Sequence, residues 1–432
     1  MATRPFSATG PDPRRETHDD DRTRFPRTGP MTTAPVIQSG EEAVEVARKL
    51  ADSFAEQAGD RDRERRPPAA EVAELSESGL LGITVPARFG GAEVSVAALT
   101  EVFRTLAAAD ASIAQIPHSH FVFLEALRRQ GTEEQHARYF AEALDGARFA
   151  NAQSERGGRT AAEDATTLRR REDGGYVLDG EKYYSTGALF ADWLVVRAVL
   201  AGEAPLPTGA APKALAYIRR GTEGVTVEDD WDGMGQRTTA SGTVRLDGVR
   251  VDDGEVVPYS PLFDGPTTYG ARAQVLHAAI DAGIARGAVG AAVLAVAKAR
   301  PWFESGAGTA AGDPLVAQQA GEVEIVVRAA EALLHEAADA VDTAEREPTG
   351  GATARASVAT AVARVAAARA SLEASSALFE LGGTRSAAAS PNLSRYWRDA
   401  RTHTLHDPAR WKVQHVGRWL LSGTPPPRHG QL

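Results

Sequence analysis

The sequence predicts a mixed α+β fold: an N-terminal helical domain, a central antiparallel β domain and a C-terminal four-helix bundle. Apolar residues recur every three to four positions before residue 146 and again after about residue 270, which is the period of one helix face. Between these regions apolar and polar residues alternate, as is typical of strands. Strands follow one another there without helices between them, so we expect an antiparallel sheet.

Four segments follow one another along the chain. Residues 1–36 are rich in Arg, acidic residues and Pro, a composition that cannot bury enough apolar surface to order itself, so we expect a disordered tail. Either Met1 or Met31 could be the natural start. The helical domain is predicted over 37–146, the β domain over 147–262 and the bundle over 263–432.

The helical domain carries clear start and stop signals. Ser39 and Glu42 form a capping-box pattern, and Pro67-Pro68 breaks the first helix before a second over 69–78. Further helices are expected over 95–109 and 111–129. Thr132 with Gln135 then begins another.

The remaining elements follow from periodicity alone. Strands are predicted over 176–185, 193–200, 214–218, 224–227 and 241–251, with the β domain ending near Pro258. Four long helices are predicted over about 270–300, 313–346, 352–381 and 397–421. Small residues such as Ala368 and Ser375 form a seam that lets helices approach closely.

Composition excludes several classes of function. The chain has no cysteine among its 432 residues, which excludes disulfides, thiolate metal sites and a cysteine nucleophile. A formal net charge of -10 gives no field for a nucleic-acid backbone, so no nucleic acid is expected as a partner. The longest apolar stretch is about half the ~20 residues of a membrane span, so we expect no membrane partner and a cytoplasmic location.

No nucleotide or metal motif is evident. Gly233-Met-Gly235 lacks the third glycine of a dinucleotide fingerprint, and a turn between strands explains it. His118 and His120 share no face of a helix, and His403 with His406 has no evident third ligand, so no metal site is predicted. Any chemistry is therefore expected to depend on an organic cofactor.

Four stretches together resemble the acyl-CoA dehydrogenase fold. They are Val85-Pro86-Ala-Arg-Phe-Gly-Gly91, Asn151-Ala-Gln-Ser-Glu155, Gly180-Glu-Lys-Tyr-Tyr-Ser-Thr-Gly187, and Gly382-Gly-Thr-Arg385 leading to Arg398-Asp-Ala-Arg401. Within that fold, other stretches are similar to the flavin-dependent monooxygenases of sulfur acquisition, which include dibenzothiophene and alkanesulfinate monooxygenases. These are residues 235–242, 299–302 and 426–430, and above all Trp397-Arg-Asp-Ala-Arg-Thr-His-Thr-Leu-His-Asp-Pro408.

One departure separates the chain from the dehydrogenases. Many of them carry a tyrosine–glutamate pair just after the Arg-Asp-Ala stretch, and the glutamate is the catalytic base. Here the matching pair is His406-Asp407, followed by Pro408. Asp407 is one methylene shorter and Pro408 redirects the chain, whereas an imidazole suits proton handling near neutral pH. The resemblance therefore favours a monooxygenase with His406 facing the flavin.

The resemblance implies a role for each of a set of polar residues and glycines. The catalytic residues are His406, Ser185 and Asn151. The flavin contacts are Ser154, Thr186, Ser241, Arg300, Gly382, Gly383 and Arg385, of which Arg300, from a neighbouring subunit, and Arg385 neutralise the FMN phosphate. The substrate side is lined by His118, His120, Tyr184 and His403.

Each role has an ordinary structural alternative. Ser185 and Thr186 could be strand residues facing solvent, and Asn151 could end a strand. Arg385 could cap a helix carbonyl, Arg300 could be a surface charge, and His406 could be a satisfied helix-end histidine.

The function implied by the resemblance is the oxygenase component of a two-component monooxygenase. A separate NAD(P)H:flavin reductase supplies FMNH2, and O2 reacts with it to give a flavin C4a-hydroperoxide. This oxidises a small organosulfur compound, a sulfide, sulfone or sulfinate. The resemblance also implies a homotetramer. Two alternatives remain: an FAD-dependent acyl-CoA dehydrogenase with Asp407 as base, and a non-catalytic helical scaffold.

Overall fold

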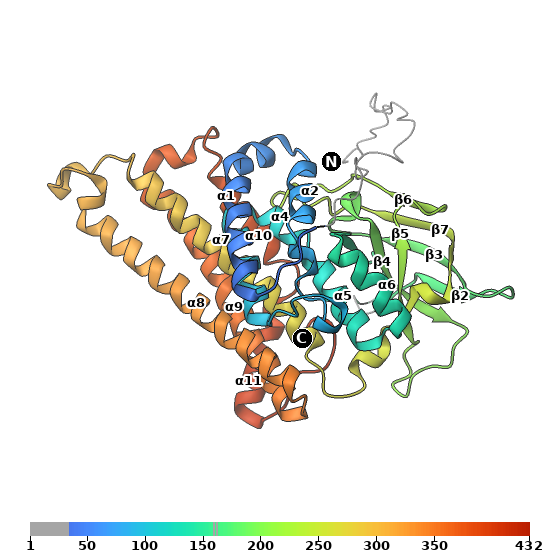
Figure 1. Ribbon diagram of the computed structural model, residues 1–432. Coiled ribbons are helices and arrows are strands. Elements are labelled where there is room, and N and C mark those ends of the chain that lie inside the picture. Colours follow the sequence, from blue (N-terminus) through green and yellow to red (C-terminus); the bar gives the residue numbers. More distant parts are fainter. Residues whose placement is uncertain (1–33, 159, 161–162) are drawn as a thin grey trace, which may run out of the picture.

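The computed structural model describes residues 34–158, 160 and 163–432, in which two helical regions flank a sheet (Figure 1). The helices before the sheet are α1 (Gly40–Glu64), α2 (Ala69–Glu77), α3 (Val96–Ala109), α4 (Ala111–Gln115), α5 (His118–Gln130) and α6 (Glu133–Leu144). The strands are β1 (Phe149–Ala152), β2 (Thr167–Arg170), β3 (Tyr176–Lys182), β4 (Trp193–Ala201), β5 (Lys213–Arg219), β6 (Val225–Val227), β7 (Val244–Val251) and β8 (Val256–Pro258). The helices after it are α7 (Tyr269–Val296), α8 (Pro314–Arg346), α9 (Gly350–Gly382), α10 (Ser394–His403) and α11 (Ala409–Ser422).

The predicted helix starts in the N-terminal region are confirmed. The Ser39 side chain accepts a hydrogen bond from the Glu42 backbone, and Thr132 with Gln135 forms a complete capping box. Of the predicted tail, residues 1–33 lie outside the described residues, and Ala34 is buried. The single helix predicted over 111–129 is wrong. Pro117 has no backbone N–H to continue α4, so α5 begins after it and turns a corner.

The sheet is mostly antiparallel, and its described order is β6-β7-β3-β2-β4-β5-β8, with β1 paired to β4. The predicted antiparallel β domain is confirmed, with two exceptions in the pairing: β1 and β2 both run parallel to β4. β2 and β3 form an antiparallel pair that lies between β1 and β4 in sequence, so β4 returns by a crossover and not by a hairpin. The short strands β2 and β8 gave no separate alternation signal in the sequence.

The C-terminal region is a helical bundle in which α7, α8 and α9 form the long members. The helix predicted over 397–421 is wrong as a single element, because α10 ends at His403 and α11 begins at Ala409. Pro408 cannot donate a backbone hydrogen bond and disfavours helical geometry in the residue before it. The interruption creates a turn that carries His406 and Asp407.

Helix α7 lies at the centre of the molecule. By length and composition it is the one helix in the described part of the chain that could cross a membrane, although no span was expected from the sequence. Its residues from Tyr269 to Ala285 are buried, and it carries Arg272 and Asp281 in that stretch. A buried core helix of a folded protein meets the same criteria of length and apolar composition. The burial of these residues identifies α7 as such a core helix.

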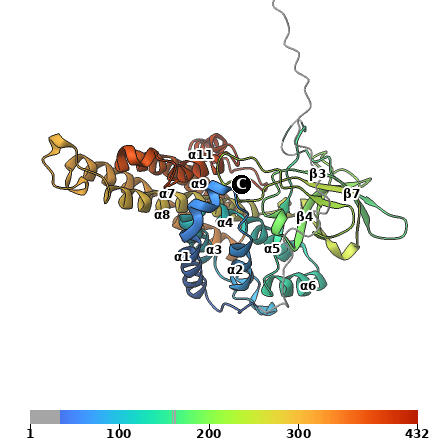
Figure 2. The ribbon, with the colours of Figure 1, turned by 90° about the horizontal axis from the view of Figure 1, so that it is seen from above.

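The helical regions surround α7 on different sides. The N-terminal helices contact it through α3 and α5, while α8 and α9 pack along it and α11 lies against α9 (Figure 2). The sheet lies beside α5 and α6, and the bundle extends away from it (Figure 1). The α4–α5 corner therefore lies where sheet, N-terminal helices and bundle meet.

Candidate functional site

Four histidines from three parts of the chain meet beside α7. His277 of α7 lies with its ring centroid 3.9 Å from that of His118, the first residue of α5. It lies 4.0 Å from that of His406, in the turn between α10 and α11. His403, the last residue of α10, places Nε2 3.0 Å from Nδ1 of His277. The side chain of His406 is 41% exposed, whereas the other three residues are buried.

A chain of buried charges lies behind the histidines. Nδ1 of His403 lies 2.6 Å from a carboxylate oxygen of Asp281. The other oxygen of Asp281 accepts from Arg364, which also reaches Asp407 at 3.4 Å. Asp407 completes the chain with Lys412 at 2.5 Å. Charges alternate in sign along it, which is how buried ionised groups are stabilised.

Burial sets the charge state of this cluster. Desolvation lowers the pKa of His118 to about 3, although its Nε2 bonds the Ala273 carbonyl. Desolvation also lowers the pKa of His277 well below its usual value, and lowers that of His403 despite its bond to Asp281. Burial alone would raise the pKa of Asp407, but His406, Arg364 and Lys412 hold it far below its ordinary range. Three neutral imidazoles therefore lie beside an ionised Asp407.

A second polar group lies at the end of β3 in the sheet domain. Nδ2 of Asn151 donates to the carbonyl of Tyr184 at 3.2 Å. Thr186 and Ser241 share a hydroxyl hydrogen bond of 2.8 Å, and Ser241 bonds Thr239 at 2.7 Å. Ser185 is fully buried, and its hydroxyl has no partner among the described residues. The alternative of a solvent-facing strand serine is therefore wrong for Ser185, which follows β3.

The backbone around this group is strained and closely packed. Tyr184, Gln236 and Ala240 adopt positive φ angles of 55°, 46° and 49°, and such residues cluster at functional sites. A Cβ at Gly235 would lie 1.9 Å from the Arg398 carbonyl oxygen, so only glycine lets this loop touch α10. The Gly233–Gly235 stretch is thus a loop between strands that packs on the bundle.

A buried acid fastens the same loop. Asp399 of α10 accepts a hydrogen bond of 2.6 Å from the backbone N–H of Gln236. Desolvation, with the nearby charge of Asp62, raises the pKa of Asp399 to about 7. The loop that carries Ser241 is therefore tied to the helix that carries His403.

The α4–α5 corner joins the two groups. A Cβ at Gly187 would lie 3.3 Å from the Ile116 side chain, so the segment after Ser185 abuts this corner. His118, two residues after Ile116, begins α5 and stacks on His277. The structure thus brings the predicted residues His118, His403 and His406 together around His277, and the segment after Ser185 packs on the corner at which α5 begins.

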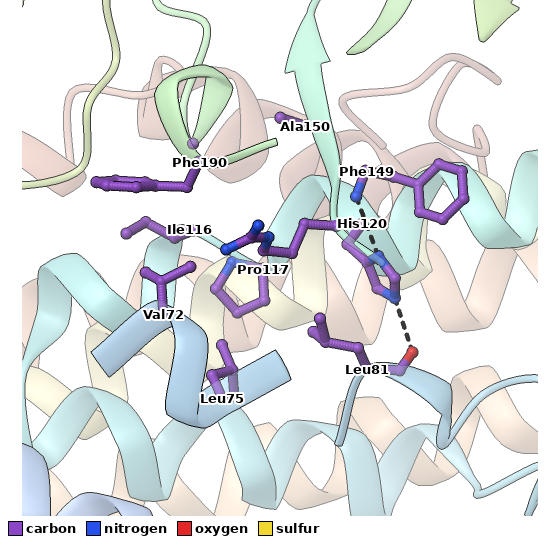
Figure 3. A pocket seen from close by; sticks show the side chains of 11 residues that line it. Val72, Leu75, Leu81, Ile116, Pro117, His120, Phe149, Ala150 and Phe190 are labelled. Carbon is purple, nitrogen blue, oxygen red and sulfur yellow. Dashed lines mark hydrogen bonds between the residues drawn. The ribbon is translucent and has the colours of Figure 1, made fainter. Parts of the chain in front are cut away.

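His120 lies apart from this junction. It lines a small, mostly apolar pocket between α2, the α4–α5 corner and β1 (Figure 3). Its Nε2 lies 2.7 Å from the Leu81 carbonyl, and its Nδ1 accepts from the Phe149 N–H at 3.3 Å. Both ring nitrogens are engaged by backbone, so His120 fastens β1 to the helical domain. Its predicted substrate role stays a prediction.

The predicted phosphate residues lie at the far end of the bundle. Arg385 is exposed and donates to the Lys298 carbonyl at 2.5 Å, in the segment just past the end of α7. Arg300 follows nearby and is exposed. A Cβ at Gly382 would lie 2.8 Å from that of Ala295, whereas Gly383 faces open space. Ser154 is exposed at the sheet edge, bridged to Tyr183.

Sequence reasoning missed His277, Asp281 and Arg364. The spacing of His277 and Asp281 is one helical turn, but both look like ordinary polar residues in an apolar helix. Only the tertiary contact with His403 identifies them. In the described part of the chain no group of three or more acidic residues or histidines is placed to hold a metal ion.

The residues at the junction fit a flavin. A flavin ring presents N–H donors and carbonyl acceptors along its edge, and hydroxyl groups can pair with either. The unpartnered, buried hydroxyl of Ser185 and the linked hydroxyls of Thr186 and Ser241 supply such groups. His406 offers a half-exposed imidazole from the bundle side.

Comparison with known proteins agrees with this fit. Residues 39–147, 150–249 and 275–411 match the N-terminal, middle and C-terminal domains of acyl-CoA dehydrogenases. The chain is 31% identical over 398 residues to a dibenzothiophene monooxygenase of Rhodococcus qingshengii, covering 89% of this chain and 94% of that protein. It is 33% identical over 404 residues to a probable FMNH2-dependent monooxygenase of Pseudomonas putida, covering 91% and 98%. The FMN-bound crystal structure of TdsC from Paenibacillus sp. A11-2 superposes with a TM-score of 0.85 at 31% identity, covering 90% of this chain and 100% of that one.

Proposed function

Because the chain belongs to the acyl-CoA dehydrogenase family and, within it, to the group of FMN-dependent monooxygenases, we propose that it is the oxygenase component of a two-component system that oxidises a small organosulfur compound. A sulfide, sulfone or sulfinate is the substrate class, and a separate NAD(P)H:flavin reductase supplies FMNH2. One observation carries the proposal. The half-exposed imidazole of His406 lies against His277 in the histidine cluster, while the neighbouring carboxylate is locked in ion pairs.

The bound FMNH2 supplies the electrons that activate O2, so that one oxygen atom passes to sulfur and the other leaves as water. Ser185, Thr186 and Ser241 would hold the flavin through their hydroxyl groups, and Asn151 orients the Tyr184 carbonyl. His406 holds or releases a proton at its ring nitrogens. The neutral histidines behind it keep water and net charge out of the site.

The dehydrogenase alternative conflicts with the state of Asp407. A base for proton abstraction must be free to accept a proton. Asp407 is 4% exposed and paired with both Arg364 and Lys412, which hold its pKa far below its ordinary range. A carboxylate in this state is a poor base. The scaffold alternative has no support from the relatives, which are named as enzymes.

The position of the arginines supports an assembly of several copies. At about 1.5 Å rise per residue, the end of α7 lies about 28 Å from His277 along the helix. Arg300 and Arg385 therefore lie far from the histidine cluster of their own chain, and we propose that they serve the site of a neighbouring copy. Large apolar side chains at that end are also exposed, Trp302 by 61% and Phe303 by 79%. A homotetramer is the assembly we propose.

A cytoplasmic location belongs to the same proposal, because the reductase draws on NAD(P)H. The formal net charge of -10 supports partners other than nucleic acid. Nothing in the proposed reaction requires a membrane.

Flavin identity and turnover test the proposal. The purified protein should hold little flavin, bind FMNH2 in preference to FAD, and form an oxidised sulfur product only with O2 and a generic flavin reductase. Turnover should be measured with small thioethers, sulfones and sulfinates. Tight stoichiometric FAD, together with reduction of an electron acceptor by an acyl-CoA, would overturn it.

A further inference from the structure

His277 is the residue at the centre of the histidine cluster, and the proposed function gives it no role. It lies on α7 with 1% of its surface exposed, in a helix whose buried face is otherwise mostly apolar. A buried imidazole is costly unless its nitrogens are paired. The contacts of the His277 ring therefore indicate what this residue does.

The ring of His277 lies between two other imidazoles. The planes of His118 and His277 are inclined by 30° at a centroid distance of 3.9 Å. The planes of His277 and His406 are inclined by 37° at 4.0 Å. Two rings cannot occupy one face of a third at these distances, so His118 and His406 lie on opposite faces. His277 thus determines how far the half-exposed His406 can move toward α5.

The hydrogen bonds of His277 define its tautomer. Asp281 forms an ion pair with Arg364, so its carboxylate can only accept hydrogen bonds. Nδ1 of His403 therefore carries a proton and donates a hydrogen bond to Asp281. A neutral His403 then has a bare Nε2, which must accept. The group 3.0 Å away is Nδ1 of His277, which therefore carries its proton there and leaves Nε2 as an acceptor.

The groups that face this ring come from every packed element. His118 from α5, His403 from α10 and His406 from the following turn contact the ring, and Asp281 of α7 with Arg364 of α9 lies behind His403. Arg364 and Asp281 balance in charge, and the buried imidazoles are neutral. A proton added to His277 would lie beside three other imidazoles and a guanidinium, without a carboxylate in contact with its own ring.

We propose that His277 is a positioning residue for the oxygenation reaction: its ring fixes the place of His406, and its Nδ1–H donates to Nε2 of His403, whose Nδ1 is held by Asp281. This rests on the proposed function for its catalytic consequence only. The tautomer and the stacking are properties of the protein without flavin. Nε2 of His277 stays free to accept a hydrogen bond from the junction.

The first test is made on the flavin-free protein. Histidine labelled with 15N should show, by solid-state NMR at pH 7.5, a neutral His277 protonated at Nδ1 and bare at Nε2. The H277F variant identifies its signals by their loss. In that variant the Nε2 signal of His403 should shift, because its donor is gone. A His277 protonated at Nε2, or at both nitrogens, would overturn the proposal.

The second test separates the ring from the hydrogen bond. H277F keeps a ring between His118 and His406 but has no donor, whereas H277N keeps a donor toward His403 but loses the ring. Each should lower kcat for sulfur oxidation by about 10²-fold, the loss expected when a reacting group is misplaced. FMN affinity should change by less than about twofold, and peroxide release per NAD(P)H should rise.

A matched control is available on α6. His136 is also buried, and its Nε2 lies 2.8 Å from the Leu127 carbonyl. H136F should retain kcat and the peroxide yield, even if it loses stability. If H277F and H277N behave like H136F, the positioning role is wrong. If wild-type protein oxidises no sulfur compound, the proposed function fails, while the NMR result still decides the placement of His277.

Discussion

The side chain of Asp407 forms a 2.5 Å ion pair with Nζ of Lys412, and both groups are buried. Removing one partner of a buried pair leaves an uncompensated charge, so we expect K412M to lower the free energy of unfolding by about 3–5 kcal/mol. Urea denaturation at pH 7 measures this. R88M, which breaks the exposed pair of Arg88 with Glu133, should unfold at nearly the urea concentration of wild type, because solvent screens that pair.

The ion pair of Asp407 with Lys412 also predicts a loss of stability in acid. The pKa of Asp407 is lower in the folded protein than in the unfolded chain, so its stabilising contribution is present above the unfolded pKa and is lost as pH falls below about 4. The difference between wild type and K412M should therefore shrink in acid. A difference that stays constant down to pH 3 would contradict this account of the pair.

His406 is the most exposed of the four clustered histidines. H406A should reduce sulfur oxidation by about 10²–10⁴-fold, the range for a positioned acid or base, and raise peroxide release. The fold should survive, because 41% of the side chain is exposed. Product and peroxide are measured in the same assay. H335A on α8, where the side chain is 61% exposed, is the control and should match wild type.

His120 predicts a pH dependence of stability. Burial lowers its pKa to about 4, whereas an unfolded histidine titrates near 6.5. Between these values the unfolded chain binds more protons, so stability falls as pH decreases. In H120Q, this fall should be less steep by about 1.4 kcal/mol per pH unit between pH 4.5 and 6. Urea midpoints across this range measure it, and parallel curves for wild type and variant would contradict it.

Periodicity and capping signals were sufficient to predict the order of elements. Ser39 and Thr132 begin helices as expected, because a cap acts through residues three positions away. The errors lie where tertiary context decides. Pro117 and Pro408 lie inside apolar patterns that predicted continuous helices, and both end them. The parallel pairing of β1 with β4 depends on a crossover that local alternation cannot show.

Only those site residues that lie in recognisable sequence motifs could be predicted. His406, His403 and His118 were expected near the flavin, and the structure brings them together through His277. His277 itself carries no sequence signal, because its meaning comes from residues more than a hundred positions away. Arg385 shows the reverse case: its motif suggested phosphate, and within its own chain it bonds the Lys298 carbonyl just past α7.

The Ser185 hydroxyl should contribute to FMN binding but not to the stability of the flavin-free protein. This buried hydroxyl has no partner among the described residues, and an unpaired buried polar group costs about 1–3 kcal/mol. S185A should therefore leave the flavin-free protein as stable as wild type or more so, but weaken FMN binding about tenfold. Thermal unfolding with and without FMN measures both. Ser76 of α2 has an equally unpartnered buried hydroxyl, so S76A should be stable and bind FMN normally.

Arg300 and His406 should complement each other between copies. Arg300 lies past the end of α7, and that end is about 28 Å along the helix from His277, so the proposed assembly has Arg300 serve a neighbour's site. R300A and H406A homo-oligomers should both have low activity. When the two variants are co-expressed, a mixed pair holds one site with both native residues and one with neither, so random pairing restores activity to about a quarter of the sites. Co-purified tags measure the mixed species. If co-expression gives no more activity than the separate variants, Arg300 serves no neighbouring site.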